Sequence, residues 1–179
     1  MDRPLKVYLI GLPGSGKTTL GKALAAKLEF TFTDLDQVIA AQEGMSIPDI
    51  FRTRGEAAFR LAEQQALLRI SSAGGRMVIA TGGGAPCFHD NMERMKATGI
   101  TIYIDVPLDE LIRRMEAGKE GRPLLADQGG ESLADRLRRL DSERRPIYAA
   151  ANLTIKGAAL RAEDLAQMLD WAIEAGGRG

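Results

Sequence analysis

Three features that would place a protein outside the cytoplasm or in a membrane are scarce in this sequence. Among 179 residues only Cys87 is a cysteine, so no internal disulfide can form and nothing indicates an oxidising compartment. No apolar run approaches the about 18 residues of a membrane-spanning helix. The apolar stretch near the N-terminus is too short for a signal-peptide core. We therefore expect a cytoplasmic protein without a membrane partner.

Net charge and internal repeats are also absent. Lys and Arg number 24, Asp and Glu number 24, and the formal net charge is zero, so no broad positive field favours nucleic acid. The length suits one domain, because domains commonly run about 100–200 residues. We expect a single domain over residues 1–179, a monomer, and no nucleic-acid partner.

Short apolar and β-branched runs alternate with amphipathic helical patterns along the chain. We predict strands at residues 7–10, 30–33, 77–81, 100–106 and 152–155. Helices are expected from Lys17, Ser46, Leu108 and Ser132, the last of them ending before Pro146. Trp171 has core spacing on a closing helix. The alternation favours an α/β fold with a parallel sheet between helices.

The strongest motif is GLPGSGKT at residues 11–18, which fits the pattern of a P-loop. Its glycines let the backbone turn amides toward an anion, and the following helix adds partial positive charge. Lys17 can reach the β- and γ-phosphates of ATP, and the Thr18 hydroxyl can ligate Mg²⁺. An apolar strand before the motif and a helix after it are the required context. The alternative is a glycine-rich turn that binds nothing.

Asp34 and Asp36 follow the second predicted strand, beside the P-loop at the carboxyl edge of the sheet. Residues two apart on a strand point the same way, so both carboxylates could face a ligand. One could support Mg²⁺ and the other could accept a proton from a hydroxyl or orient it. The alternative for either residue is a helix cap.

Arginines and a glycine run complete the candidate site. Arg60, Arg122 and Arg144 could grip a carboxylate or close over phosphates, although most arginines are solvated surface charges. Residues 82–84 are three glycines at the end of a buried strand, where a ligand can approach the backbone. A plain strand-exit turn is the alternative. The residues alone do not say which arginine would bind the carboxylate and which would close over the phosphates.

In this order, these motifs resemble those of shikimate kinases, over residues 11–148. The shared residues, beyond the P-loop, are Asp34, Asp36, Phe51, Gly55, Glu56, Phe59, Arg60, Glu63, Gly82, Gly83, Gly84, Arg122, Pro123, Leu124, Leu125, Arg144, Pro146 and Tyr148. The resemblance implies a three-layer P-loop fold of the nucleoside-monophosphate kinase type. Its five-stranded parallel sheet would carry a substrate-binding region at about 34–63 and a mobile lid at about 117–131.

The resemblance also implies a reaction and its residues. ATP would phosphorylate the 3-hydroxyl of shikimate, a step toward chorismate and the aromatic amino acids. The implied catalytic residues are Lys17, Asp36 and Arg122. Shikimate would be bound by Asp36, Arg60, Gly82, Gly83 and Arg144, and Mg²⁺ by Thr18 and Asp34. ATP would be bound by Gly14, Ser15, Gly16, Lys17, Thr18, Thr19 and Arg122.

Two rival functions remain open at this stage. A related kinase could phosphorylate gluconate or a nucleoside monophosphate, and a regulatory module could bind a nucleotide without catalysis. Arg145 beside Arg144 leaves the carboxylate grip ambiguous by one position.

Overall fold

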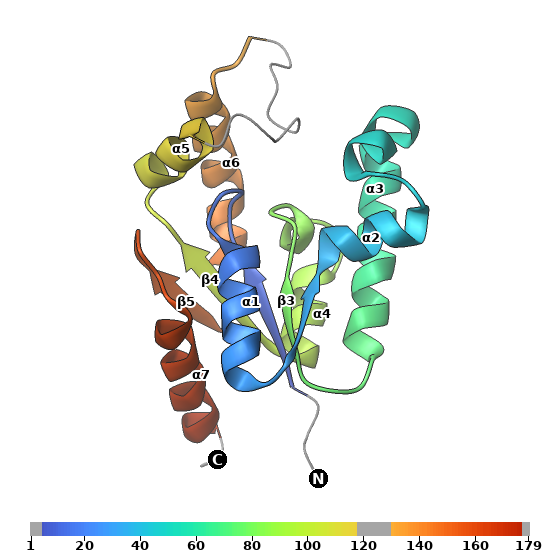
Figure 1. Cartoon of the computed structure of the whole chain (residues 1–179). Helices are drawn as coiled ribbons and strands as arrows, with labels where there is room; N and C mark the ends of the chain where they lie inside the picture. The colour runs from blue at the N-terminus through green and yellow to red at the C-terminus, as the bar shows by residue number, and fades with distance from the viewer. Residues whose placement is uncertain (1–4, 118–129, 177–179) are drawn as a thin grey trace.

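The computed structural model describes residues 5–117 and 130–176. Its centre is a parallel sheet of five strands in the order β2-β3-β1-β4-β5 (Figure 1). The strands are β1 (Lys6–Ile10), β2 (Thr31–Asp34), β3 (Met77–Ala80), β4 (Ile100–Asp105) and β5 (Leu153–Lys156). Every pairing is parallel, as helical crossovers between strands require.

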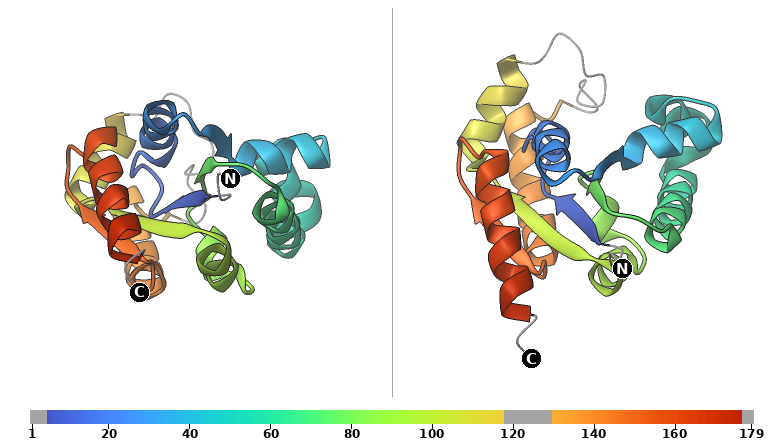
Figure 2. Two further views of the ribbon diagram at one scale, coloured as in Figure 1. Left: turned by 90° about the horizontal axis from the view of Figure 1, so that it is seen from below. Right: turned by 60° about the horizontal axis from the view of Figure 1, so that its bottom comes forward.

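Helices cover both faces of this sheet and extend beyond one edge. Helices α1 and α4 lie on opposite faces, α7 packs against α1, and α2 and α3 project past β2 (Figure 2). The helices are α1 (Lys17–Leu28), α2 (Leu35–Glu43), α3 (Ile47–Ser72), α4 (Asn91–Thr98), α5 (Leu108–Ala117), α6 (Leu133–Tyr148) and α7 (Ala162–Gly176), with a short 3₁₀ turn, η1 (Ala85–Cys87), after β3. This α/β arrangement confirms the predicted fold.

The core centres on β1, whose five residues are all buried. Val7, Leu9 and Ile10 are fully buried, and β3 and β4 flank them on either side. Burial of such side chains stabilises the fold by about 1.5–3 kcal/mol each. The first P-loop residue follows this strand directly, so the site begins at the end of a fully buried central strand.

Two glycines and a serine shape α2 and α3. Gly44 caps α2 with a φ of 66°. Ser46 caps α3 by accepting a hydrogen bond from the Asp49 amide at 3.3 Å. Gly55 departs from helical geometry inside α3, with φ 79° and ψ 173°, so α3 is two helical stretches joined at this residue. The second stretch carries Arg60 toward the sheet.

Three features of the chain differ from the sequence-based expectations. Helix α6 does not end before Pro146: it continues to Tyr148, because only one backbone hydrogen bond is lost at proline and tertiary contacts hold the last turn. Helix α4 was not predicted. Trp171 is 68% exposed on α7 rather than packed in the core. Within the described residues, no helix combines the length and the apolar character needed to cross a bilayer.

Candidate functional site

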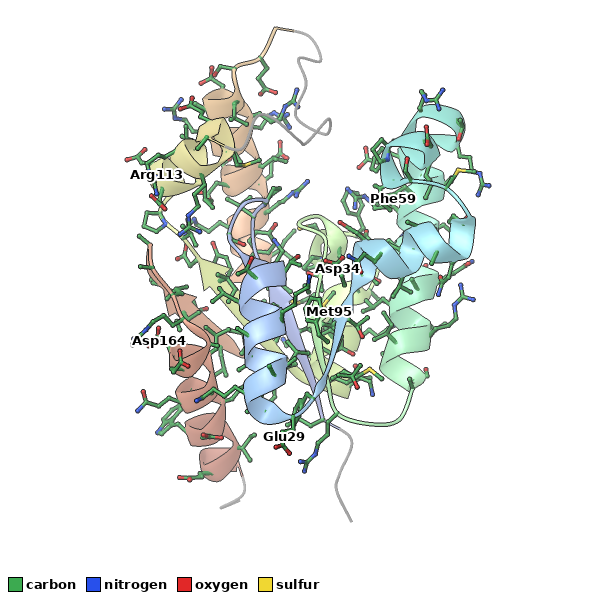
Figure 3. All side chains as sticks on the ribbon, viewed as in Figure 1. Glu29, Asp34, Phe59, Met95, Arg113 and Asp164 are labelled. Carbon is green, nitrogen blue, oxygen red and sulfur yellow. The ribbon has the colours of Figure 1, made fainter. Side chains whose placement is uncertain are left out.

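Loops that follow three neighbouring strands meet at the carboxyl edge of the sheet. Residues 11–16 follow β1, Asp34 ends β2, and residues 81–84 follow β3. Figure 3 shows Asp34 at this edge, with Phe59 on the neighbouring wall formed by α3. This is the edge at which open α/β sheets bind ligands.

The P-loop forms the compact turn that its sequence predicts. Gly14 and Gly16 adopt φ values of 80° and 88°, which side chains with a Cβ rarely tolerate. Lys17 is buried, and its Nζ donates to the carbonyls of Gly11 and Leu12 at 2.8 and 2.9 Å. Its ammonium group therefore lies inside the loop, at the N-terminus of α1, where both charge and helix dipole favour an anion.

Thr18 and Asp34 join the P-loop to the second strand. The Thr18 hydroxyl donates to Asp34 Oδ2 at 3.0 Å. The other oxygen, Oδ1, accepts from the backbone amides of Asp36 and Gln37 and so caps α2. The helix-cap alternative therefore holds for Asp34, but it uses only one of the two oxygens. A hydroxyl and a carboxylate side by side are the hard oxygen donors that Mg²⁺ prefers.

Asp36 and Glu63 bring two carboxylates to the glycine run after β3. A Cβ atom added to Gly82 would lie 3.0 Å from Asp36 Oδ1 and 3.3 Å from Glu63 Oε1. Asp36 lies in the first turn of α2 rather than on the strand. The expectation that Asp34 and Asp36 point the same way because they are two apart on a strand is therefore wrong. Burial, and then the neighbouring Asp34 carboxylate, raise the pKa of Asp36, while Lys17 and Arg60 oppose this.

Glu63 is fully buried, and one of its oxygens, Oε1, has no hydrogen-bond partner within the described residues. Burial raises the pKa of Glu63 to about 7, because loss of solvent outweighs the attraction of Arg60. A buried, unpaired carboxylate oxygen beside a glycine run indicates a place where a hydroxyl donor can bind.

Arg60 is held from several sides at the wall of this site. Its Nε and one terminal nitrogen donate to Glu56 at 3.2 and 3.1 Å, and the other donates to Glu63 at 2.9 Å. The guanidinium also lies 3.9 Å from the centre of the Phe88 ring. A Cβ at Gly84 would lie only 2.7 Å from two Arg60 nitrogens, so the absence of a side chain there makes room for this arginine.

Arg144 and Arg145 point in different directions, although they are adjacent. A Cβ at Gly83 would lie 3.2 Å from an Arg144 terminal nitrogen. Arg145 instead pairs with Asp141 at 3.0 Å and Asp105 at 3.1 Å. Arg144 forms no ion pair with any carboxylate of the described residues, so of these two adjacent arginines it is the one that lies at the glycine run.

Other candidate residues lie at the border of the site or outside the described part. Thr19 is exposed in the first turn of α1. Arg122 and most of the predicted lid, residues 118–129, lie outside the described residues. No sequence motif pointed to Arg114, which joins the nucleotide side by donating to Gly14 O at 3.4 Å and to Ala158 O. Phe88 also escaped prediction, because a single aromatic residue carries no pattern.

Comparisons of sequence agree with this geometry. The family model for shikimate kinase matches residues 13–172. A shikimate kinase from Parabacteroides distasonis is 42% identical over 149 residues, which cover 83% of this chain and 86% of the relative. A shikimate kinase from Synechococcus elongatus is 45% identical over 151 residues, covering 84% and 76%.

Comparisons of structure point the same way. The crystal structure of shikimate kinase from Bacteroides thetaiotaomicron superposes with a TM-score of 0.86 at 38% identity, covering 95% of this chain and 98% of that one. Shikimate kinase from Acinetobacter baumannii, solved in complex with shikimate, gives a TM-score of 0.85 at 37% identity, covering 98% and 95%. The resemblance inferred from the motifs is confirmed, and the chain belongs to the shikimate kinase family.

Proposed function

We propose that this chain transfers the terminal phosphate of ATP to the 3-hydroxyl of shikimate, yielding shikimate 3-phosphate and ADP on the route to chorismate. The observation that carries the proposal is the convergence of Asp36, Glu63, Arg60 and Arg144 on residues 82–84, next to the P-loop. Guanidinium forks suit a carboxylate, and carboxylates suit hydroxyl groups. Shikimate carries both kinds of group on one ring.

ATP binding is assigned to the P-loop. The backbone amides and side chains of residues 14–19 surround the phosphates, and Lys17 supplies a point charge at the β- and γ-phosphates. The buried position of Lys17 supports this role, because a desolvated ammonium interacts strongly with an anion. Phosphoryl transfer depends on positioning and charge neutralisation more than on covalent chemistry, so Lys17 acts as a catalytic residue as well.

Mg²⁺ is assigned to Thr18 and Asp34. Their 3.0 Å contact brings a hydroxyl and a carboxylate together at the N-terminus of α1, which fits a hard divalent cation. When bound there, the ion supplies positive charge against the phosphate oxygens. Asp34 keeps its capping contacts through its other oxygen, so the residue can serve both roles.

Shikimate is assigned to the glycine run and its surroundings. Arg60 and Arg144 hold the carboxylate, and Asp36 holds the ring hydroxyls and receives the proton of the attacking one. Gly82 and Gly83 let the ring approach the backbone. Burial supports the role of Asp36, because it raises the pKa of this carboxylate. A raised pKa makes the carboxylate a better proton acceptor near neutral pH.

The remaining assignments extend beyond the described residues. We infer a single domain over residues 1–179, with a substrate-binding region at about 34–63 and a lid at about 117–131. Arg122 in that lid would act as the catalytic arginine that meets ATP. A monomer that works in the cytoplasm without a nucleic-acid partner fits the neutral net charge.

An ADP-release assay with several acceptors tests the proposal. Wild-type protein with ATP and Mg²⁺ is expected to turn over shikimate and to leave gluconate and nucleoside monophosphates unused. Preference for either rival acceptor would replace this function with that of a related kinase. ATP binding without turnover of any acceptor would favour a nucleotide-binding module.

A further inference from the structure

Arg145 ties helix α6 to the sheet. On its own helix it pairs with Asp141, one turn earlier, through Nε contacts of 3.1 and 3.2 Å. Its terminal nitrogen reaches Asp105 at the end of β4, 40 positions away, at 3.1 Å. The first contact is local to the helix, whereas the second fixes where the helix lies against the sheet.

Asp105 is suited to hold such a contact. It is buried to 8% exposure, and its Oδ1 accepts a hydrogen bond from the buried Tyr103 hydroxyl at 3.1 Å. Oδ2 is left for Arg145, with the exposed Lys156 ammonium farther away at 4.0 Å. A buried carboxylate needs a cation and hydrogen-bond donors around it, and Asp105 has both.

A neighbouring face of the same helical turn contacts the candidate substrate site. Arg144 and Tyr148 are four residues apart, so they share one face of α6. The buried Tyr148 hydroxyl donates to Gly83 O, and its ring packs 5.1 Å from that of Tyr103. Arg144 and Arg145 are about 100° apart around a helix, so the rotation of α6 about its axis decides which of the two arginines faces Gly83.

We propose that Asp105 is a positioning residue for the acceptor. By holding Arg145 at the carboxyl end of β4, it fixes the rotation of α6 that directs Arg144 to the glycine run. The inference rests on the proposed function, in which Arg144 binds the carboxylate of shikimate. Pro146 strengthens the need for this tie, because it lacks the N–H that would bond to the Ser142 carbonyl.

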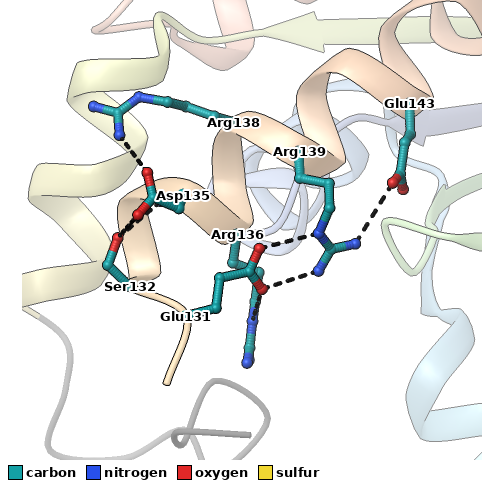
Figure 4. A network of polar contacts seen from close by, with 7 residues as sticks. All are labelled: Glu131, Ser132, Asp135, Arg136, Arg138, Arg139 and Glu143. Atoms are coloured by element: carbon teal, nitrogen blue, oxygen red, sulfur yellow. Dashed lines mark hydrogen bonds and ion pairs between the residues drawn. The ribbon is translucent and has the colours of Figure 1, made fainter. Parts of the chain in front are cut away.

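Residues 131–143, which run from just before α6 into its second half, offer a contrast and a control. There, Glu131 accepts two hydrogen bonds from Arg139, each at 3.1 Å, and Arg139 also lies 3.6 Å from Glu143 (Figure 4). Arg139 and Glu143 are each about half exposed, and their contact joins two residues of the same helix rather than the helix and the sheet. Surface pairs of this kind contribute little, so losing one should not rotate the helix.

Steady-state kinetics with each substrate varied in turn test the proposal. Asp105→Asn is expected to raise the KM for shikimate about tenfold, within the range of coupling between contacting residues. The KM for ATP and kcat should stay within about twofold, because a shift of Arg144 affects acceptor binding rather than the P-loop. Glu143→Gln, the matched control on the same helix, should leave all three constants unchanged.

Arg145 variants decide whether Asp105 acts through this arginine. Arg145→Met should match Asp105→Asn, Arg145→Lys should recover most of the lost affinity, and the double variant should be no worse than either single variant. Because Arg145 is 43% exposed, its truncation tests the idea even if Asp105→Asn fails to fold. An unchanged KM for shikimate in Arg145→Met, additive effects, or equal rises in both KM values would overturn the proposal.

Arg144→Met separates this inference from the proposed function. It should raise the KM for shikimate more than Asp105→Asn does. If wild-type protein used shikimate but Arg144→Met bound it normally, the carboxylate assignment and the role of Asp105 would both be rejected while the function stood. If wild-type protein did not use shikimate, the proposed function itself would fail.

Discussion

The nucleotide side and the acceptor side of this site are built in different ways. The nucleotide side is built mainly on one contiguous stretch, residues 11–19, whose geometry depends on glycine backbone and on Lys17 folded into its own loop. The acceptor side takes side chains from α2, α3 and α6 and brings them to the glycines after β3. Phosphates need a cradle of amides and charge, whereas a ring with hydroxyls and a carboxylate needs groups from several directions.

The difference predicts how each side fails when it is altered. A change in the P-loop should affect ATP use with any acceptor, because the contacts come from the loop itself. A change on the acceptor side should act on shikimate while leaving ATP binding intact. Variants that alter the use of only one substrate would support this division into two sides. Variants on one side that alter the use of both substrates would contradict it.

Lys17→Met should have the largest effect. It removes a buried ammonium from the phosphate cradle and should lower kcat/KM for ATP about 10³-fold or more, in the range of charge-clamp residues in phosphoryl transfer. Lys27→Met, which removes an exposed lysine of the same helix, is the control and should change little. Similar kinetics for the two variants would remove Lys17 from the nucleotide site.

Asp36→Asn should lower kcat by about 10² to 10³, because the amide cannot receive the hydroxyl proton. Calorimetric titration should show that the Kd for ATP is unchanged, since Asp36 lies on the acceptor side. If turnover survived, Asp36 would have no catalytic role, and if ATP binding were lost as well, the two sides would not be separable.

Glu63 should give the acceptor side a pH-dependent stability. Its pKa rises from 4.5 to about 7 on folding, so its contribution to stability is present below about pH 4.5 and is lost as pH rises through 7. Urea unfolding of wild type and Glu63→Gln should show that the wild type loses about 2 kcal/mol more between pH 5 and pH 8. Parallel pH profiles would mean that Glu63 is charged throughout this range.

Gly84→Ala should have the smallest effect of the four. The added methyl would lie 2.7 Å from the Arg60 nitrogens, so Arg60 must shift and the KM for shikimate should rise about tenfold, as for contacting residues. The KM for ATP should stay unchanged. Gly74→Ala, where a Cβ meets nothing within 4 Å, is the control. An equal response of the two variants would show that Arg60 does not depend on this glycine.

The sequence predicted the contiguous parts of the molecule well, because their signals are local. The P-loop motif, the helix start at Ser46, and the alternation of strands and helices all depend on neighbouring residues. Strand bounds agree to within about one residue, as in β2, expected at 30–33 and found at Thr31–Asp34.

Features that depend on contacts between residues distant in the sequence were harder to predict. Neighbouring arginines 144 and 145 are equivalent in the sequence, and the choice between them depends on Asp105, which is remote along the chain. The end of α6 was misjudged at Pro146, because Tyr148 holds the last turn through Gly83 O. Trp171 has core spacing, yet it is 68% exposed. Arg122 remains a prediction from the family resemblance.

The most direct test of the central claim is to identify the product by ³¹P and ¹H NMR after incubation of the wild-type protein with ATP, Mg²⁺ and shikimate. The account predicts one new phosphate monoester whose phosphorus couples to the proton on carbon 3 of the ring. A phosphate on another hydroxyl, or inorganic phosphate with unmodified shikimate, would contradict it.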